Sequence, residues 1–252
     1  MIRLDGATVL LQWASGGLAF LWVTTRRREV GLGYGWLLRA IYAVFAIASV
    51  VIGAIFDPVA VREIFTASMA VAATVALVVS IVRRRAGVAA FPVRLDTIAP
   101  CLGLVALVAA GIDAGDPALL SLARVVVGAA FLGAVSDAML LGHWYLVQPG
   151  MSRAPLNQLV RSVGYVWPAE LAVMLWPTGM VSALRGTVDD GANGLLSWFW
   201  VACAVTTIAL VVVTRAALRE KQYAAVMAAT GLLYLAILTA FGMDLVARAI
   251  LA

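Results

Sequence analysis

Apolar runs of roughly 20 residues recur along the whole of this 252-residue chain, and they limit its fold more than any other feature. Each run, at about 1.5 Å per residue in a helix, is long enough to cross a hydrocarbon core about 30 Å thick. Charged residues make up only 12% of the chain, against about 25% in soluble domains. The sequence therefore predicts an all-α, polytopic integral membrane bundle of about eight transmembrane helices. The expected spans are Ala7–Thr24, Tyr34–Phe56, Ile64–Val82, Thr97–Ile112, Ala118–Leu141, Leu156–Leu184, Leu195–Val213 and Tyr223–Ile250.

The connections between these runs are short, and they alternate in charge. Because basic connections stay in the cytoplasm, both termini are expected on the extracytoplasmic side of the membrane. We expect a single transmembrane domain over residues 1–252, without a soluble domain. The basic connections hold Arg26, Arg27 and Arg28; Arg83, Arg84, Arg85 and Arg94; Arg153 and Arg161; and Arg215, Arg219 and Lys221.

The basic residues also bear on the partners and the source of the chain. The net charge of +5 comes from the loops, so the expected contact surface is a lipid bilayer and not a nucleic acid. Lys221 is the only lysine among 18 Lys and Arg residues. Such arginine usage, with abundant Ala, Val and Gly, is typical of a GC-rich bacterial genome. The expected location is therefore the bacterial plasma (inner) membrane.

Glu170 is the polar residue that membrane placement explains least. It lies inside the sixth run, between Pro168 and Pro177, and each proline is expected to kink the helix and free a carbonyl. An ionised side chain at the bilayer centre costs at least about 2.5–3.5 kcal/mol. Glu170 is therefore expected either to form a functional site in a polar cavity or to be a protonated group bonded to a neighbouring helix. Arg124 is expected either to form a buried ion pair with Glu170 or to snorkel to the outer leaflet.

A second polar group is expected near the cytoplasmic ends of the fifth and sixth runs. It comprises Asp137, His143, Tyr145, Arg161 and Tyr165. Reduction of a quinone adds protons, so a carboxyl or a histidine near the head group would act as a relay. With Glu170, these residues are the predicted quinone or proton-relay residues. A structural interpretation also stays open, in which the histidine belongs to an interfacial aromatic belt and the arginine anchors lipid phosphate.

Three further expectations concern helix packing and pairing. Gly133, with Gly128 nearby, predicts the close approach of another helix to the fifth run. Asp244 and Arg248 are four residues apart on the last run and predict a local ion pair. Arg39, near the cytoplasmic end of the second run, is expected to anchor lipid phosphate.

The residue inventory excludes several cofactor sites. A single histidine cannot supply both ligands of a membrane haem b, and no lysine inside a run can form a retinal Schiff base. No spacing of His, Cys and acidic residues is that of a metal site. Cys101 and Cys203 lie in separate runs without a CxxC spacing, which predicts two free thiols. We therefore expect no covalent or metal-bound cofactor, and quinone is the one ligand left open.

Three functions remain open. The first is a cofactor-free membrane subunit that anchors partners or holds a quinone in a respiratory or other electron-transfer complex, and that is not catalytic alone. The eight-helix plan with both ends outside resembles, in topology, the membrane anchors of polysulfide- and dimethylsulfoxide-reductase-type complexes, which implies this function by fold analogy. The second is a small-solute or lipid transporter or channel, favoured by the prolines of the sixth run. The third is a structural scaffold without a ligand.

Overall fold

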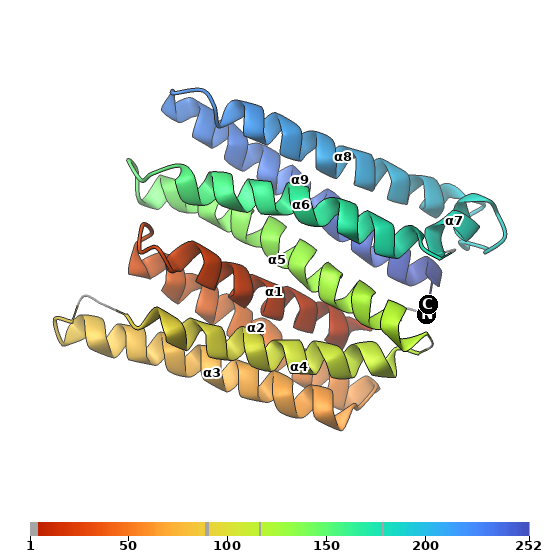
Figure 1. The fold of residues 1–252 in the computed structure, drawn as a ribbon, viewed down its shortest axis with the longest axis horizontal. Coiled ribbons are helices and arrows are strands. Elements are labelled where there is room, and N and C mark those ends of the chain that lie inside the picture. The colour runs from red at the N-terminus through yellow and green to blue at the C-terminus, as the bar shows by residue number, and fades with distance from the viewer. Residues whose placement is uncertain (1–4, 89–90, 116, 178, 252) are drawn as a thin grey trace.

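The computed structural model of the chain describes residues 5–88, 91–115, 117–177 and 179–251. Within these ranges, every regular element is a helix. Eight helices are long, and consecutive long helices run in opposite directions (Figure 1). The elements are α1 (Gly6–Thr25), α2 (Leu32–Phe56), α3 (Ala60–Arg85), the 3-10 helix η1 (Val93–Thr97), α4 (Ile98–Asp113), α5 (Ala118–Val147), α6 (Ala154–Leu175), α7 (Gly179–Leu184), α8 (Leu195–Ala217) and α9 (Tyr223–Leu251).

The prediction of a polytopic all-α membrane bundle is confirmed. Within the described residues, seven helical stretches are both long and apolar enough to span a membrane, one of them being η1 with α4. The eighth long helix, α6, runs beside α5 and α8 (Figure 1), but Arg161 and Glu170 make it less apolar. The side of the membrane on which the termini lie stays a prediction.

The long helices form two four-helix groups that meet where α1 and α4 of the first group pack on α5 of the second. In the first group, α1 to α4, and in the second, α5, α6, α8 and α9, every helix packs on two others of its own group. The two groups lie side by side, with α1 against α5 (Figure 1). The start of α1 and the end of α9 lie at the same end of the bundle, which we call the terminal end. The opposite end carries the arginine-rich loops, and we call it the arginine end.

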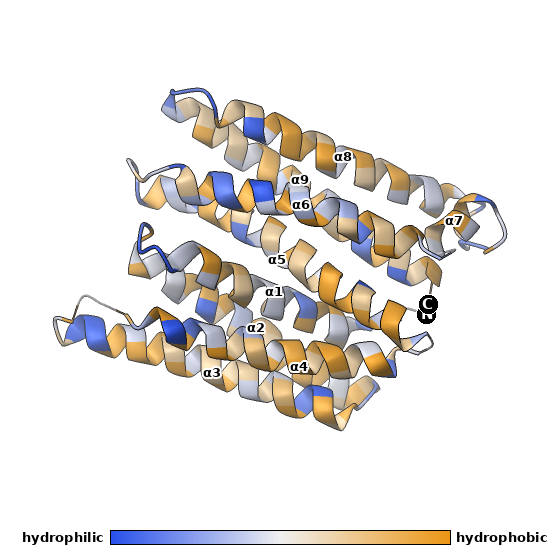
Figure 2. Ribbon diagram, viewed as in Figure 1, coloured by the Kyte–Doolittle hydropathy of each residue, from blue (hydrophilic) through white to orange (hydrophobic). Residues whose placement is uncertain are grey.

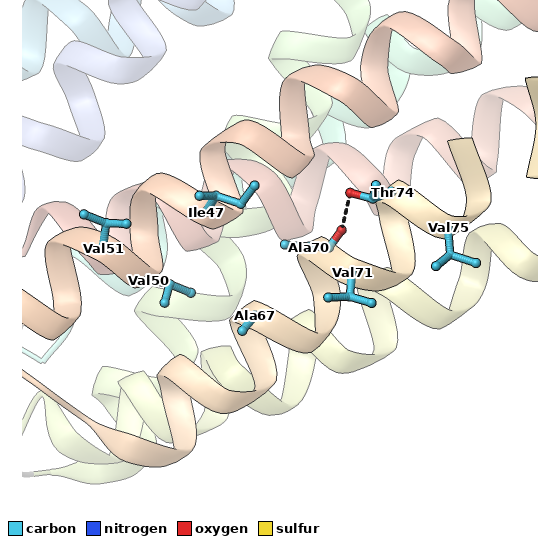
Figure 3. Close-up of a pocket in the computed structure, with 8 residues that line it drawn as sticks. All are labelled: Ile47, Val50, Val51, Ala67, Ala70, Val71, Thr74 and Val75. Carbon is cyan, nitrogen blue, oxygen red and sulfur yellow. Dashed lines mark hydrogen bonds between the residues drawn. The ribbon is translucent and has the colours of Figure 1, made fainter. Parts of the chain in front are cut away.

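The outward faces of the helices are apolar, as lipid contact requires. Figure 2 shows hydrophobic residues along the helices and hydrophilic ones in the loops at the two ends. A shallow groove of about 340 Å³ lies between α2 and α3, and its lining is aliphatic apart from Thr74 (Figure 3). The Thr74 hydroxyl donates to the Ala70 carbonyl of its own helix at 2.8 Å. The groove therefore offers lipid an apolar surface without an unpaired polar group.

The expected sixth span, Leu156–Leu184, is wrong as a single helix. Helix α6 continues through Pro168 and ends before Pro177, after which α7 forms a separate short helix. The chain thus breaks once instead of bending twice. The break lies at Pro177, which has no amide hydrogen to donate to the Val173 carbonyl, and Arg124 of α5 donates to that carbonyl instead, at 2.8 Å. This bond satisfies an end carbonyl that the helix itself cannot pair.

Glycines allow the backbones of α1 and α5 to touch. A Cβ atom at Gly133 would collide with the backbone of Gly16, and one at Gly16 would collide with the Ala129 carbonyl. A Cβ atom at Gly128 would overlap the side-chain amide nitrogen, Nε2, of Gln12. The close approach predicted at Gly133 and Gly128 is confirmed, and the partner is α1.

Candidate functional site

Five polar side chains from four helices meet inside the bundle near its terminal end. Arg124 lies six residues after the start of α5, and Glu170 lies five residues before the end of α6. At 1.5 Å per residue, the five positions are roughly 5–11 Å from the terminal end of their helices. All five side chains are buried. We call them the acid–arginine cluster: Gln12, Arg124, Glu170, Asp244 and Arg248.

Gly128 provides the space in which the helices of the cluster face one another. A Cβ atom at Gly128 would lie 3.2 Å from Asp244 Oδ1 and 3.5 Å from Arg248 Nη2. The predicted ion pair of Asp244 and Arg248 is confirmed, with Nε 2.8 Å from Oδ2. Gln12 donates from Nε2 to the Val125 carbonyl at 2.8 Å, which ties α1 to α5.

Glu170 is fully buried, neither of its carboxyl oxygens accepts a hydrogen bond from a donor among the described residues, and the Asp244 carboxyl is its side-chain hydrogen-bonding neighbour. The charged groups that act on it most strongly are Asp244, then Arg248, then Arg124. Nine buried side-chain polar atoms in the described residues lack a partner, and five belong to the cluster. Because buried polar groups are nearly always hydrogen-bonded, this concentration marks the cluster as the candidate site. The five atoms are Gln12 Oε1, Glu170 Oε1 and Oε2, Asp244 Oδ1 and Arg248 Nη2.

Arg124 lies beside Glu170, but its hydrogen bonds go to the end of α6 in place of the expected ion pair. Its Nε donates to the Val173 carbonyl at 2.8 Å, and its Nη2 donates to the Trp176 carbonyl at 3.3 Å. The residue is only 3% exposed, so it does not snorkel to a leaflet. The end of a helix carries unpaired carbonyls and a partial negative charge. These groups satisfy the guanidinium and leave the Glu170 carboxyl without a hydrogen bond from Arg124.

A narrow cavity leads from the terminal end of the bundle toward the cluster. Its lining includes Asp5, Asp57 and Arg62 of the first helix group, and Val125 and Arg248 beside the cluster. Its volume is about 10 Å³. A cavity needs about 10–15 Å³ to hold one water molecule, so this one has room for about one.

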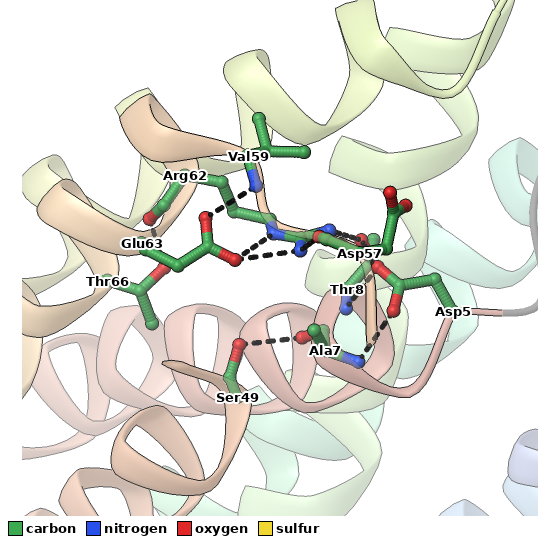
Figure 4. Close-up of polar contacts among 9 residues, drawn as sticks. All are labelled: Asp5, Ala7, Thr8, Ser49, Asp57, Val59, Arg62, Glu63 and Thr66. Atoms are coloured by element: carbon green, nitrogen blue, oxygen red, sulfur yellow. Dashed lines mark hydrogen bonds and ion pairs between the residues drawn. The ribbon is translucent and has the colours of Figure 1, made fainter. Parts of the chain in front are cut away.

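Arg62 organises the polar residues at the mouth of this cavity (Figure 4). Its Nη1 lies 2.6 Å from Asp5 Oδ2, and its Nη2 lies 2.8 Å from Glu63 Oε1 and 2.6 Å from the Asp57 carbonyl oxygen. Asp5 also accepts hydrogen bonds from the first amides of α1. The mouth is therefore a fixed network of charged groups.

Asp137 is also buried, but it lies at a different level. It follows Arg124 by 13 residues on α5, which is about 20 Å along the helix. The Tyr42 hydroxyl donates to Asp137 Oδ1, and the Tyr34 hydroxyl donates to the Asp137 backbone carbonyl at 3.3 Å. Its Oδ2 has no partner among the described residues. Asp137 thus packs against α2 and is not brought together with Glu170.

The other predicted relay residues do not gather around one point. His143 is exposed, and its Nδ1 lies 3.3 Å from the Tyr234 hydroxyl. Tyr145 is buried, and its hydroxyl donates to a backbone carbonyl in the loop before α6. Arg161 and Tyr165 are exposed on α6. His143 and Tyr145 lie near the arginine end, Arg161 lies seven residues into α6, and Tyr165 lies at the middle of that helix.

The burial of Arg39 corrects its expected role as an exposed anchor for lipid phosphate. It is 2% exposed, with Nε 2.8 Å from Asp96 Oδ1 and Nη2 2.7 Å from Oδ2. This bidentate geometry is the strong form of an arginine–carboxylate pair. Neither Asp96 nor Gln12 was expected to take part in such contacts. The sequence does hold a sign of these contacts, because Asp96 borders an apolar run and Gln12 interrupts one. A polar residue at such a position needs a partner.

Comparisons with known proteins give no relative from which a function could be carried over. No protein-family model matches the chain, and neither a curated protein nor a solved structure matches it. Within the described residues, no three His, Cys, Asp or Glu side chains are placed to hold a metal ion. Cys101 and Cys203 are free thiols, as predicted, and Cys101 is exposed.

Proposed function

We propose that this protein is a proton-transferring, cofactor-free membrane subunit of a larger electron-transfer complex. The observation that supports the proposal is the buried Glu170 carboxyl, which accepts no hydrogen bond from the described residues and lies beside Asp244 and two arginines. With both acids ionised, the cluster is neutral. A proton on Glu170 breaks no existing hydrogen bond, whereas a proton on Asp244 would weaken its ion pair with Arg248. Glu170 is the proposed proton carrier, and Asp244 is its exchange partner.

The size of the cavity beside the cluster favours a proton over a larger ligand. Its volume of about 10 Å³ is far below the roughly 300–1,000 Å³ of small-molecule sites. One water molecule is enough to pass a proton between carboxyl groups. The proposed path runs from the mouth at Asp5 and Asp57, past Arg248, to Asp244 and Glu170.

A quinone reaction would require a proton carrier such as Glu170, because quinone reduction consumes protons and quinol oxidation releases them. Electrons would come from redox centres in partner subunits. Asp137, with one unpaired carboxyl oxygen beside Tyr42, is the second proposed relay group. His143, Tyr145, Arg161 and Tyr165 stay separate candidates for a quinone contact, since the structure does not bring them to one point.

The test uses the native complex after gentle detergent extraction, with mass spectrometry to identify partner polypeptides and bound quinone. Proton uptake coupled to quinone reduction is then compared between the wild type and Glu170→Gln. Glutamine has the same shape but cannot carry the proton, so we expect uptake to fall about 100-fold or more. Glu220→Gln, which changes an exposed loop carboxyl, is the matched control. Uptake in Glu170→Gln equal to that of the control would contradict the proposal.

A small-solute transporter is the second candidate, and the break between α6 and α7 favours it. Broken helices often carry substrate sites, because their ends present partial charges inside the membrane. Here the break adjoins Arg124 and the cluster. For a transporter, we expect the chain to purify without partners or quinone and to move a solute into liposomes. We also expect Glu170→Gln to abolish this transport. That result would support the transporter and reject the electron-transfer proposal.

A further inference from the structure

A second pocket lies at the arginine end of the bundle, where the proposed proton path does not reach. It has a volume of about 250 Å³ and is bounded by the loop after α1, the first turns of α2 and the segment before η1. None of its lining residues belongs to the acid–arginine cluster. The residues that matter for its chemistry are Thr25, Arg28, Gly31, Gly35, Arg39 and Phe91.

Arg39 brings an unused hydrogen-bond donor to this pocket. Asp96 takes up its Nε and Nη2, while Nη1 has no partner among the described residues. The Phe91 ring covers the guanidinium, with the ring centroid 4.4 Å from Cζ. Gly35 makes room for the guanidinium itself, because a Cβ atom there would lie 2.8 Å from Nη1. The donor is therefore buried, held in place beside the pocket and without a hydrogen-bond partner among the described residues.

The start of α2 adds positive potential to the same pocket. Helix α2 begins at Leu32, and no side chain caps its first turn. The first amides of a helix have no partner within the helix, and together they carry a partial positive charge. Both Gly31 and Leu32 line the pocket, so an acceptor bound there would face these amides as well as Arg39.

The backbone of Arg28 supplies a further sign of a binding site. Arg28 lines the pocket and has a φ of +56°, a left-handed conformation that is uncommon outside glycine. Such conformations cluster at ligand-binding positions, where the surrounding structure maintains them. Arg27, its neighbour, is exposed and does not line the pocket.

We infer that this pocket binds a phosphate-type anion and that its source is the head group of an acidic phospholipid. The charge of Arg28, the unused donor of Arg39 and a helix start suit a phosphate, while Asp96 already balances the charge of Arg39. Basic pockets between transmembrane helices at the cytoplasmic side hold anionic head groups in this way. The apolar walls formed by Val30, Leu32 and Val93 suit a ligand that continues into the hydrocarbon. A soluble phosphate ester shares the chemistry of the head group but does not use these walls.

The test measures thermal unfolding of the full purified chain in neutral detergent during three titrations. The ligands are phosphatidylglycerol, glycerol 3-phosphate and inorganic phosphate, and phosphatidylcholine is the reference lipid. We expect phosphatidylglycerol to raise the melting temperature more than phosphatidylcholine does. Stabilisation by the soluble phosphates at equal or lower concentration would move the source from lipid to solution. No stabilisation by any of the three anions would overturn the inference.

Three variants separate a built site from general attraction to an anionic surface. General attraction to an anionic surface loses only about fivefold in binding when one surface arginine is removed. This fivefold weaker binding is expected for the matched control Arg27→Gln. Arg28→Gln and Gly35→Ala, which places a methyl group before Arg39 Nη1, should each weaken phosphatidylglycerol binding by more than tenfold. Arg28→Gln keeps the Arg39–Asp96 pair, whereas the Gly35→Ala methyl group would lie 2.8 Å from Nη1 and 3.3 Å from Nη2, so the guanidinium must shift. Equal losses in Arg27→Gln and Arg28→Gln, with none in Gly35→Ala, would show that no specific site exists.

Discussion

Asp190 and Glu170 are both buried acids, and their surroundings separate a structural role from a functional one. The Asp190 carboxyl accepts hydrogen bonds from the amides of Ala192, Gly194 and Ser197 at 2.8–3.0 Å, and from the Ser197 hydroxyl at 3.0 Å. The Ser197 amide is the main reason that the pKa of Asp190 falls to about 2. Glu170 has no such bond. Asp190 therefore holds the loop before α8, whereas Glu170 is the proposed proton carrier.

Replacement of Asp190 by alanine should loosen this loop and the first turn of α8. We expect faster hydrogen exchange over residues 191–197 in Asp190→Ala than in Asp189→Ala, whose carboxyl accepts one amide bond, from Gly191. Because the pKa of Asp190 is lowered on folding, its stabilising effect is complete above its ordinary pKa. The effect is lost as the pH falls from about 4 to about 2. Wild-type exchange, corrected for its intrinsic pH dependence, should approach that of Asp190→Ala over this range. Equal protection in the two variants would contradict the assignment.

The sequence predicts that Glu170 lies inside a helix and names Arg124 as a partner, but it does not predict the other neighbours of Glu170. A lone acid in an apolar run needs no tertiary information to be recognised. Its neighbours Asp244 and Gln12 come from α9 and α1, and their approach depends on how those helices are rotated about their axes. The apolar pattern of a transmembrane helix does not encode that rotation, because lipid and protein interior are both apolar. The same limit explains why the Arg39–Asp96 pair was not expected.

At the scale of single helices, local sequence predicts the bounds of the long helices well. The exception is a helix whose end is bonded by a side chain of a neighbouring helix. Seven of the eight expected spans agree with a helix of the structure, and α4 is short, with 16 residues, where Pro100 and Gly103 lie. Helix α6 differs, because it ends just before Pro177, where Arg124 of α5 pairs the carbonyls of Val173 and Trp176. Pro168 is accommodated within the same helix. Proline alone therefore does not determine where a membrane helix stops.

The contact of α1 and α5 gives a prediction at this scale. In Gly133→Ala, the added methyl group meets the Gly16 backbone, and the helices must separate. Overpacking of this kind costs about 1–3 kcal/mol, which thermal unfolding in detergent should register as a lower melting temperature. Gly231→Ala on α9 is the control, because its Cβ would have no neighbour within 4 Å and alanine favours a helix. A Gly133→Ala protein as stable as the control would show that the two helices are not in backbone contact.

At the scale of the whole molecule, α5 links two sites at opposite ends of the bundle. Its terminal end contributes Arg124 to the acid–arginine cluster, and its other end contributes Gln148, which accepts a hydrogen bond from the Gly31 amide beside the arginine-end pocket. Polar bonds also join the two helix groups between these points, including that of Trp13 Nε1 to the Ser136 hydroxyl at 2.7 Å. The division into two four-helix groups was not predictable from the sequence, because the apolar faces of the runs are alike. Only glycines and isolated polar residues distinguish them.

Orientation in the membrane decides which side each site faces, and it can be measured with two single-cysteine proteins. In a background in which Cys101 and Cys203 are replaced by serine, Asp189→Cys reports the terminal end and Glu220→Cys the arginine end, since both positions are exposed. Positive-inside placement predicts that a membrane-impermeant maleimide labels Asp189→Cys in intact bacterial cells. It should label Glu220→Cys only after lysis.

The labelling pattern also tests how the two proposed sites fit the cell. With the expected orientation, the cavity mouth around Arg62 takes protons from the extracytoplasmic side, and the arginine-end pocket faces the anionic cytoplasmic leaflet, which carries the negative surface potential. The reverse pattern would make the arginine loops extracytoplasmic and turn the proton entry toward the cytoplasm. The pocket would then lose the electrostatic reason for choosing a lipid over a soluble phosphate. A single labelling experiment thus constrains the direction of proton transfer and the source of the anion together.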